Sequence, residues 1–145
     1  MKMQLRNNEI MFVIEFLMEL KLKGQDSRLR TRLVRQLQEH YNSLVMEERQ
    51  QLIEEYGVKN EDGTLKEFPV TLEDGSEGLE YKIDDIESFN KEMDNLFAEH
   101  YTIVADENTE KMLTVVKKAV FNYDEELSGV EALQYDRVCE IFEAE

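Results

Sequence analysis

The chain has 145 residues and a mass of 17.2 kDa, and 41% of its residues are hydrophobic, which is enough to bury one core. Its 33 acidic and 17 basic side chains give a net charge of −16, and there is a single Cys. A globally disordered chain, a disulfide-stapled domain and a cysteine-rich zinc module are therefore excluded.

Residues 10–22 form an apolar run that predicts a first helix over about residues 8–23, with Asn7 or Asn8 as its N-cap and Gly24 at its end. The run is broken by charges and is shorter than the roughly 20 residues that a membrane span needs. No signal-peptide cleavage site follows it, so we expect a mature helix in a reducing compartment. Its apolar residues occupy more than one stripe, which predicts burial on more than one side.

A second, long helix is predicted over residues 27–56, with Ser27 as its N-cap and Gly57 as its stop, because apolar residues recur mostly at steps of three, four and seven. Arginines gather at its start and glutamates at its end, which opposes the helix dipole. This inversion indicates a tertiary or partner contact, or else solvated ends that cost a few tenths of a kcal/mol.

The period then changes to two, and residues 64–72 and 79–83 are predicted to form a hairpin whose first strand, with Pro69, is an edge or bulged strand. A helix over about residues 84–99 follows, and residues 101–105 are expected to extend the hairpin as a third strand. Residues 108–120 are compatible with a helix, and residues 114–121 equally with a strand. A loop around Ser128-Gly129 and a short helix over about residues 136–143 complete the chain.

These elements predict an α+β fold: a long helix packed with an N-terminal helix, a β-hairpin plus a short third strand, and two or three shorter helices. We expect a single domain over residues 1–145. Its N-terminal helical part covers about residues 1–57, the hairpin and helix about residues 58–105, and the C-terminal part about residues 106–145.

Catalytic and metal-binding patterns are not found. His40 and His100 lack a nucleophile and an orienting group, and Cys139, between Val138 and Glu140, is expected to be a small packing residue. Calcium loops aligned on Gly63 or Gly75 have no acidic ligand at the first or last position. We therefore expect no enzyme activity, no cofactor and no metal.

Charge divides unevenly along the chain, since residues 1–35 carry net +4 and residues 36–145 carry net −20. Arg28, Arg30, Arg32 and Arg35 form a modest basic patch, but the acidic body repels phosphate, so we expect no direct nucleic-acid binding. Dense carboxylates can instead imitate phosphates towards a basic protein. The candidate acidic surface comprises Glu47, Glu48, Glu54, Glu55, Glu73 and Asp74.

The apolar side chains of residues 8–37 exceed what one partner helix can cover, which predicts a homodimer or a fixed protein partner there. The alternative is that the hairpin and the C-terminal helix fold back over the first helix in a monomer. The candidate interface comprises Phe12, Phe16, Leu20, Leu29, Leu33 and Leu37.

Residues 44–97 carry a more specific pattern. A charged helix ends in Glu-Glu-Arg-Gln-Gln-Leu-Ile-Glu-Glu-Tyr-Gly (47–57), continues as Val-Lys-Asn-Glu-Asp-Gly (58–63) and an acidic hairpin, and leads to Ile-Asp-Asp-Ile-Glu-Ser-Phe-Asn-Lys-Glu-Met (83–93). This pattern, and more loosely residues 127–142, resembles a small uncharacterised protein family of tailed phages and prophages of Firmicutes. Residues 10–22 and 108–120 depart from it. The resemblance implies a phage context and no catalytic residues.

We therefore expect a non-enzymatic phage protein that acts by binding another phage or host protein, as an assembly or host-takeover accessory. Its expected location is the cytoplasm of the host cell, with association with the virion as the alternative, and no membrane. The alternative function is an acidic, nucleic-acid-mimicking inhibitor of a host defence nuclease or other nucleic-acid-binding protein. Salt separates the two, because a mimic loses affinity when its charges are screened.

Overall fold

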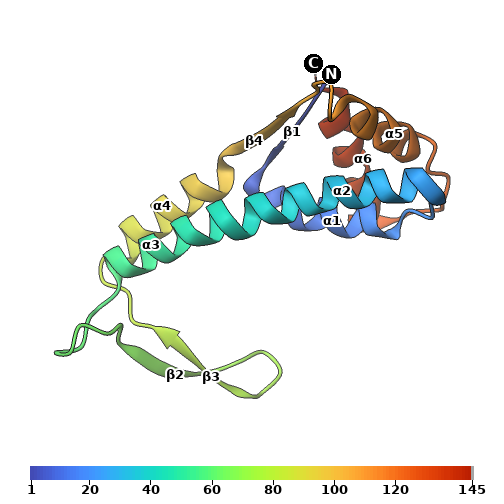
Figure 1. Cartoon of the computed structure of the whole chain (residues 1–145). Coiled ribbons are helices and arrows are strands. Elements are labelled where there is room, and N and C mark those ends of the chain that lie inside the picture. The colour runs from blue at the N-terminus through green and yellow to red at the C-terminus, as the bar shows by residue number, and fades with distance from the viewer. Residues whose placement is uncertain (145) are drawn as a thin grey trace. The chain divides into compact units, whose positions relative to one another are not determined.

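A computed structural model describes residues 1–144 (Figure 1). The chain divides into two compact units: unit 1 holds Met1–Ser43 and the chain from Ala98 onward, and unit 2 holds Leu44–Phe97. Unit 2 is therefore inserted into the sequence of unit 1, and the boundary at Ser43 and Leu44 divides the predicted N-terminal part in two. The α+β class with a long helix is confirmed.

The secondary structure consists of short strands and longer helices. Those of unit 1 are β1 (Lys2–Arg6), the 3-10 turn η1 (Asn7–Glu9), α1 (Ile10–Glu19), α2 (Gly24–His40), β4 (His100–Val104), α5 (Glu110–Phe121) and α6 (Gly129–Glu143). Those of unit 2 are α3 (Met46–Tyr56), β2 (Glu67–Thr71), β3 (Glu77–Tyr81) and α4 (Ile86–Ala98). The π-helical segment η2 (Tyr41–Val45) joins α2 to α3, so residues 24–56 are helical throughout.

The N-terminus forms a strand that the sequence analysis missed. β1 pairs antiparallel with β4, with Met3 opposite Ile103 and Leu5 opposite Tyr101. The expectation that residues 101–105 extend the hairpin is therefore wrong, because β2 and β3 form a separate two-stranded sheet. Met3 and Leu5 are fully buried, and their alternation with polar neighbours is the period of a half-buried strand.

The core of unit 1 lies between the β1–β4 sheet and four helices. α1 packs on α2 and α6, α2 packs on α5, and α6 packs on β1. The segment that was compatible with a helix or a strand is helix α5, whose buried residues recur along one face: Met112, Leu113, Val116 and Val120. α6 begins at Gly129, seven residues before the predicted start at 136.

Arg30 is a buried arginine that closes the C-terminus of α1. Its Nη1 donates to the carbonyl oxygens of Leu17 and Leu20 at 2.8 and 2.7 Å, and its Nη2 donates to Ser27 Oγ at 3.3 Å. The last carbonyls of a helix have no partner within it, and a cation there is favoured by the dipole. Arginines at the start of a helix oppose its dipole, and for Arg30 the tertiary contact with α1 explains this position.

Glu9 and Arg137 connect the start of the chain to α6. Arg137 Nε donates to Glu9 Oε2 at 2.5 Å and its Nη2 donates to Oε1 at 3.0 Å, while the Arg6 N–H also donates to Oε1 at 2.8 Å. Burial raises the pKa of Glu9, but the hydrogen bonds from Arg137 and Arg6 and the charge of Arg137 lower it by more, so the pKa lies below its ordinary value.

Unit 2 has a thin core. Its buried apolar residues are Val45, Ile53 and Leu96. At the end of α3, a Cβ on Gly57 would lie 2.5 Å from both the carbonyl oxygen of Ile53 and Leu65 Cδ2, so a side chain does not fit at the turn from helix to hairpin. The predicted hairpin and the helix after it are confirmed as β2, β3 and α4.

Replacing Arg30 with Ala removes the side-chain donor of the buried Leu20 carbonyl and leaves the Leu17 carbonyl with the Leu20 N–H at 3.3 Å alone. We expect Arg30→Ala to lower the free energy of unfolding by about 2–4 kcal/mol. The matched control is Arg32→Ala, an exposed arginine on the same helix, which should change it by about 0.5 kcal/mol or less. Urea denaturation followed by circular dichroism measures both, and equal effects would show that Arg30 does not cap α1.

Glu9→Gln should lower the free energy of unfolding by about 1–3 kcal/mol at pH 7. Because the folded pKa lies below the unfolded value of about 4.3, the ionised pair stabilises the fold above that pH and loses its contribution as the pH falls through the folded pKa. The deficit relative to the wild type should therefore shrink below about pH 4. Glu140→Gln, which removes the exposed partner of Arg137, is the control; a deficit for Glu9→Gln that is constant with pH contradicts the assignment.

Candidate functional site

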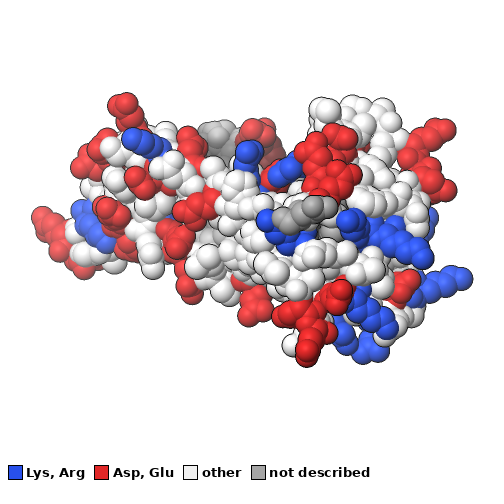
Figure 2. Space-filling view, turned by 90° about the horizontal axis from the view of Figure 1, so that it is seen from above, with Lys and Arg blue, Asp and Glu red and all other residues white. Residues whose placement is uncertain are grey.

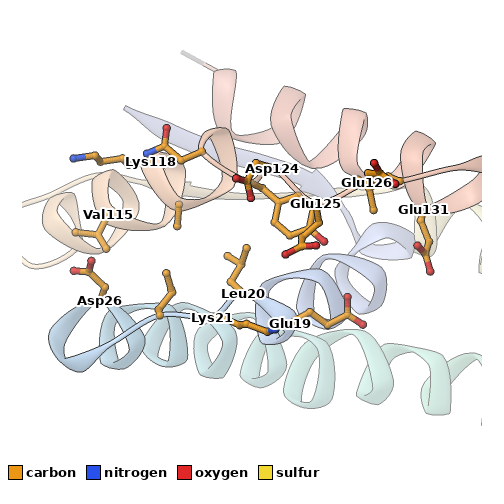
Figure 3. Close-up of a pocket in the computed structure, with 15 residues that line it drawn as sticks. Glu19, Leu20, Lys21, Asp26, Val115, Lys118, Asp124, Glu125, Glu126 and Glu131 are labelled. Carbon is orange, nitrogen blue, oxygen red and sulfur yellow. The ribbon is translucent and has the colours of Figure 1, made fainter.

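A groove of about 880 Å³ lies in unit 1 between α1 with its connection to α2 on one side and α5 with the chain that follows it on the other. Figure 3 shows Leu20 between the two walls and the carboxylates of Glu19, Glu125 and Glu131 around the space. We call it the acid-rimmed groove. Its lining residues are Glu19, Leu20, Lys21, Leu22, Asp26, Val115, Lys118, Ala119, Asn122, Tyr123, Asp124, Glu125, Glu126, Leu127 and Glu131.

The groove has an apolar floor and a charged rim. The floor is formed by aliphatic and aromatic side chains from α5 and from the two connecting segments: Leu20, Leu22, Val115, Ala119, Tyr123 and Leu127. Six carboxylates and two lysines surround it, and no ion pair between described residues involves either Lys21 or Lys118. An apolar floor with a few placed polar groups is the usual composition of a recognition groove.

Tyr123 is the residue on which the charges of the groove converge. Burial raises the pKa of its phenol, and the charges of Glu125, Glu19, Glu131 and Asp124 raise it further. These carboxylates come from α1, from the segment between α5 and α6 and from α6 itself, so the fold rather than one acidic run produces the negative potential.

An aromatic cluster supports Tyr123 from beneath the groove. Phe16 packs edge-on against Tyr123 and Tyr135, with ring centroids 5.1 and 5.4 Å apart, and the two tyrosine rings lie 5.3 Å apart. The Tyr135 hydroxyl donates to the Val120 carbonyl at 2.8 Å, and burial together with Cys139 raises the pKa of Tyr135 to about 12. These contacts fix the ring that the carboxylates surround.

The candidate interface of residues 8–37 is placed inside unit 1. Leu33 and Leu37 are fully inaccessible, and Leu20 and Leu29 are almost so. Phe12 and Phe16 are half-buried and pack against the same core. These side chains offer a second copy no exposed apolar face in this conformation, because the packing of α1, α2, α5 and α6 on one another covers them. The oligomeric state itself stays a prediction.

The candidate acidic surface lies in unit 2, whose residues 44–97 hold 16 acidic and 5 basic side chains. Glu47, Glu48, Glu54 and Glu55 share helix α3, while Glu73 and Asp74 lie between β2 and β3, so the six residues come from two separate elements. Of these, Glu54 pairs with Lys59 at 2.8 Å. Figure 2 shows carboxylates over both units, with Lys and Arg densest on the part of unit 1 that holds α5 and the start of α2.

The residues considered for catalysis have structural contacts. His40 Nε2 lies 2.9 Å from Asn7 Oδ1, and its ring stacks on Tyr101 with centroids 3.7 Å apart. Burial lowers the pKa of His40 below its ordinary value and so disfavours the charged form of the ring. Cys139 packs against the core of unit 1, and burial raises the pKa of its thiol. His100 is exposed.

Among residues 1–144, no group of three or more His, Cys, Asp and Glu side chains is arranged to hold a metal ion. Within the same residues, none of the helices combines the length and the apolar character required to cross a membrane.

The sequence analysis missed the acid-rimmed groove. The run Asp124-Glu125-Glu126 directly after a helix was the available signal, but the residues opposite it, Glu19 and Leu20, are about a hundred positions away. The packing of α1 and α5 on the same helices, α2 and α6, brings these segments together.

The potential at Tyr123 can be tested by removing one carboxylate. In Glu125→Gln the pKa of Tyr123 should fall relative to the wild type but remain above the ordinary value of about 10, because burial is the largest cause of the shift. NMR of protein labelled with ¹³C-tyrosine, assigned with Tyr123→Phe, measures it. Glu107→Gln, an exposed carboxylate outside the groove, is the control, and an equal shift in both variants contradicts the geometry.

The chain was compared with known proteins at three levels. No family model, no curated protein and no solved structure matches it.

Proposed function

We propose that the protein is a non-enzymatic binding protein whose acid-rimmed groove receives a positively charged segment of another protein. The observation that carries this proposal is that four carboxylates line the same groove as Tyr123 and its apolar neighbours, and that their charges help to raise the pKa of Tyr123. An aromatic ring surrounded by carboxylates attracts Lys and Arg side chains through their charge and through cation–π contact. The apolar floor suits their aliphatic stems.

In this proposal the partner is a phage or host protein, and the chain acts in the host cytoplasm as an assembly or host-takeover accessory. Support for this context comes from the resemblance of residues 44–97 to the phage family. The groove supplies the chemistry of binding and is independent of that resemblance.

The second candidate function is the acidic inhibitor that imitates nucleic acid. It is supported by the charge of unit 2, where the carboxylates of α3 are mostly exposed and Glu54 alone among Glu47, Glu48, Glu54 and Glu55 forms an ion pair. A mimic would use this surface and not the groove. Its binding should be lost in about 0.5 M NaCl, where the Debye length is only a few Å.

The proposal is tested by photo-crosslinking from inside the groove. A benzophenone side chain at position 127, which lines the groove, should crosslink a protein in a lysate of a Firmicutes host, and the attached peptide should carry net positive charge. The same probe at Leu133, which is 73% exposed and outside the lining, is the control. Equal products at both positions, or an uncharged attached peptide, would contradict the proposal.

Two sets of substitutions separate the two functions. Glu19→Gln, Glu125→Gln and Glu131→Gln together remove three charges around Tyr123 and should abolish the crosslink. Glu47→Gln, Glu48→Gln and Glu55→Gln remove three charges from α3 and should leave it unchanged. The reverse result supports the inhibitor instead; added salt weakens both kinds of contact and does not separate them.

A further inference from the structure

A second groove, of about 870 Å³, lies in unit 2 between α3, the β2–β3 hairpin and the start of α4. Figure 1 shows the hairpin projecting from the ends of these two helices. We call it the hairpin groove. Its lining residues are Arg49, Ile53, Lys66, Phe68, Leu79, Glu80, Tyr81, Lys82, Ile83, Ile86 and Phe89.

Large apolar side chains around the hairpin groove are open to solvent. Leu79 is 66% exposed, Ile86 54%, Phe68 41% and Tyr81 37%. Single exposed apolar residues are ordinary, but several around one hollow indicate a site for another molecule. Because unit 2 buries so few apolar residues of its own, its hairpin is the part whose apolar surface has most to gain from a partner.

The cations of unit 2 are concentrated at this groove. Of its five basic residues, Arg49, Lys66 and Lys82 line the hairpin groove, although the unit as a whole has net charge −11. In the described residues none of the three forms an ion pair, and Glu80 is the one carboxylate in the lining. The groove is therefore a local basic and apolar surface on a strongly acidic unit.

We infer that the hairpin groove docks an acidic amphipathic segment of another protein. Its apolar side chains would cover Leu79, Tyr81 and Ile86, and its carboxylates would pair with Arg49, Lys66 and Lys82. The charge of the lining, with three cations against one carboxylate, favours an acidic occupant. A second copy of this chain is the alternative that the test below decides. This inference goes beyond the proposed function, since it concerns another surface with the opposite charge preference.

The test uses two synthetic amphipathic peptides that share the same leucines and carry either Glu or Lys at every other position. Each is titrated into the full-length ¹⁵N-labelled protein. The Glu peptide should bind saturably and shift the amide signals of Leu79, Lys82 and Ile86. The Lys peptide should leave those signals unchanged and, under the proposed function, shift signals around Tyr123. The two peptides therefore test the hairpin groove and the acid-rimmed groove separately, and either inference can fail without the other.

Substitutions in the groove should change the dissociation constant of the Glu peptide by a measurable factor. Leu79→Ser should weaken binding of the Glu peptide about tenfold or more, and Lys66→Gln or Lys82→Gln about two- to fivefold each. The controls are Leu133→Ser, an equally exposed leucine of unit 1, and Lys91→Gln, an exposed lysine of α4 outside the groove. These should leave the dissociation constant unchanged.

The inference is overturned if the Glu peptide does not bind saturably, if both peptides bind equally at the hairpin groove, or if the groove and control substitutions have equal effects. Sedimentation equilibrium tests whether a second copy of this chain occupies the groove. A dimer at micromolar concentration that Leu79→Ser dissociates would show that a second copy fills the groove, which also overturns it.

Discussion

The hydrogen bonds from the Arg30 guanidinium to the end of α1 are the contact on which the acid-rimmed groove of unit 1 depends. By donating to the carbonyls of Leu17 and Leu20 it lets α1 stop in the protein interior, where free carbonyls would be costly. The chain can then turn within four residues and return as α2. This turn forms one wall of the acid-rimmed groove. The buried positive charge of Arg30 therefore helps to shape a groove whose rim is mainly negative.

The two units achieve their stability differently. Unit 1 encloses a continuous core and adds a charged pair between Glu9 and Arg137, whereas unit 2 encloses few apolar side chains and carries net −11. Exposed like charges on a small core favour loosening of the compact state. A ligand that binds only the folded form stabilises it. Docking at the hairpin groove would therefore bury apolar side chains in the unit that buries fewer of them, and would pair the cations of the groove.

Local signals in the sequence were sufficient for most of the fold. Helical spacing identified α2 with α3, and alternation between turns identified β2 and β3. β1 was missed because its five residues directly precede a strong helix, although Met3 and Leu5 already alternate with polar neighbours. The candidate interface at Leu33 and Leu37 could not be distinguished from a core, because apolar spacing does not say whether α5 or another molecule covers the face. The grooves depend on packing between elements, and the acidic run after α5 was the one local signal for the acid-rimmed groove.

The insertion of unit 2 has a consequence for synthesis. The partner of β1 is β4, which leaves the ribosome about a hundred residues later, or about 5–20 s at ordinary elongation rates. During that interval Met3 and Leu5 lack their paired strand, while the contiguous residues 44–97 of unit 2 are made. Loop closure across an inserted unit slows assembly. We therefore expect β1 to stay without its partner strand in the nascent chain until residues 100–104 have been made.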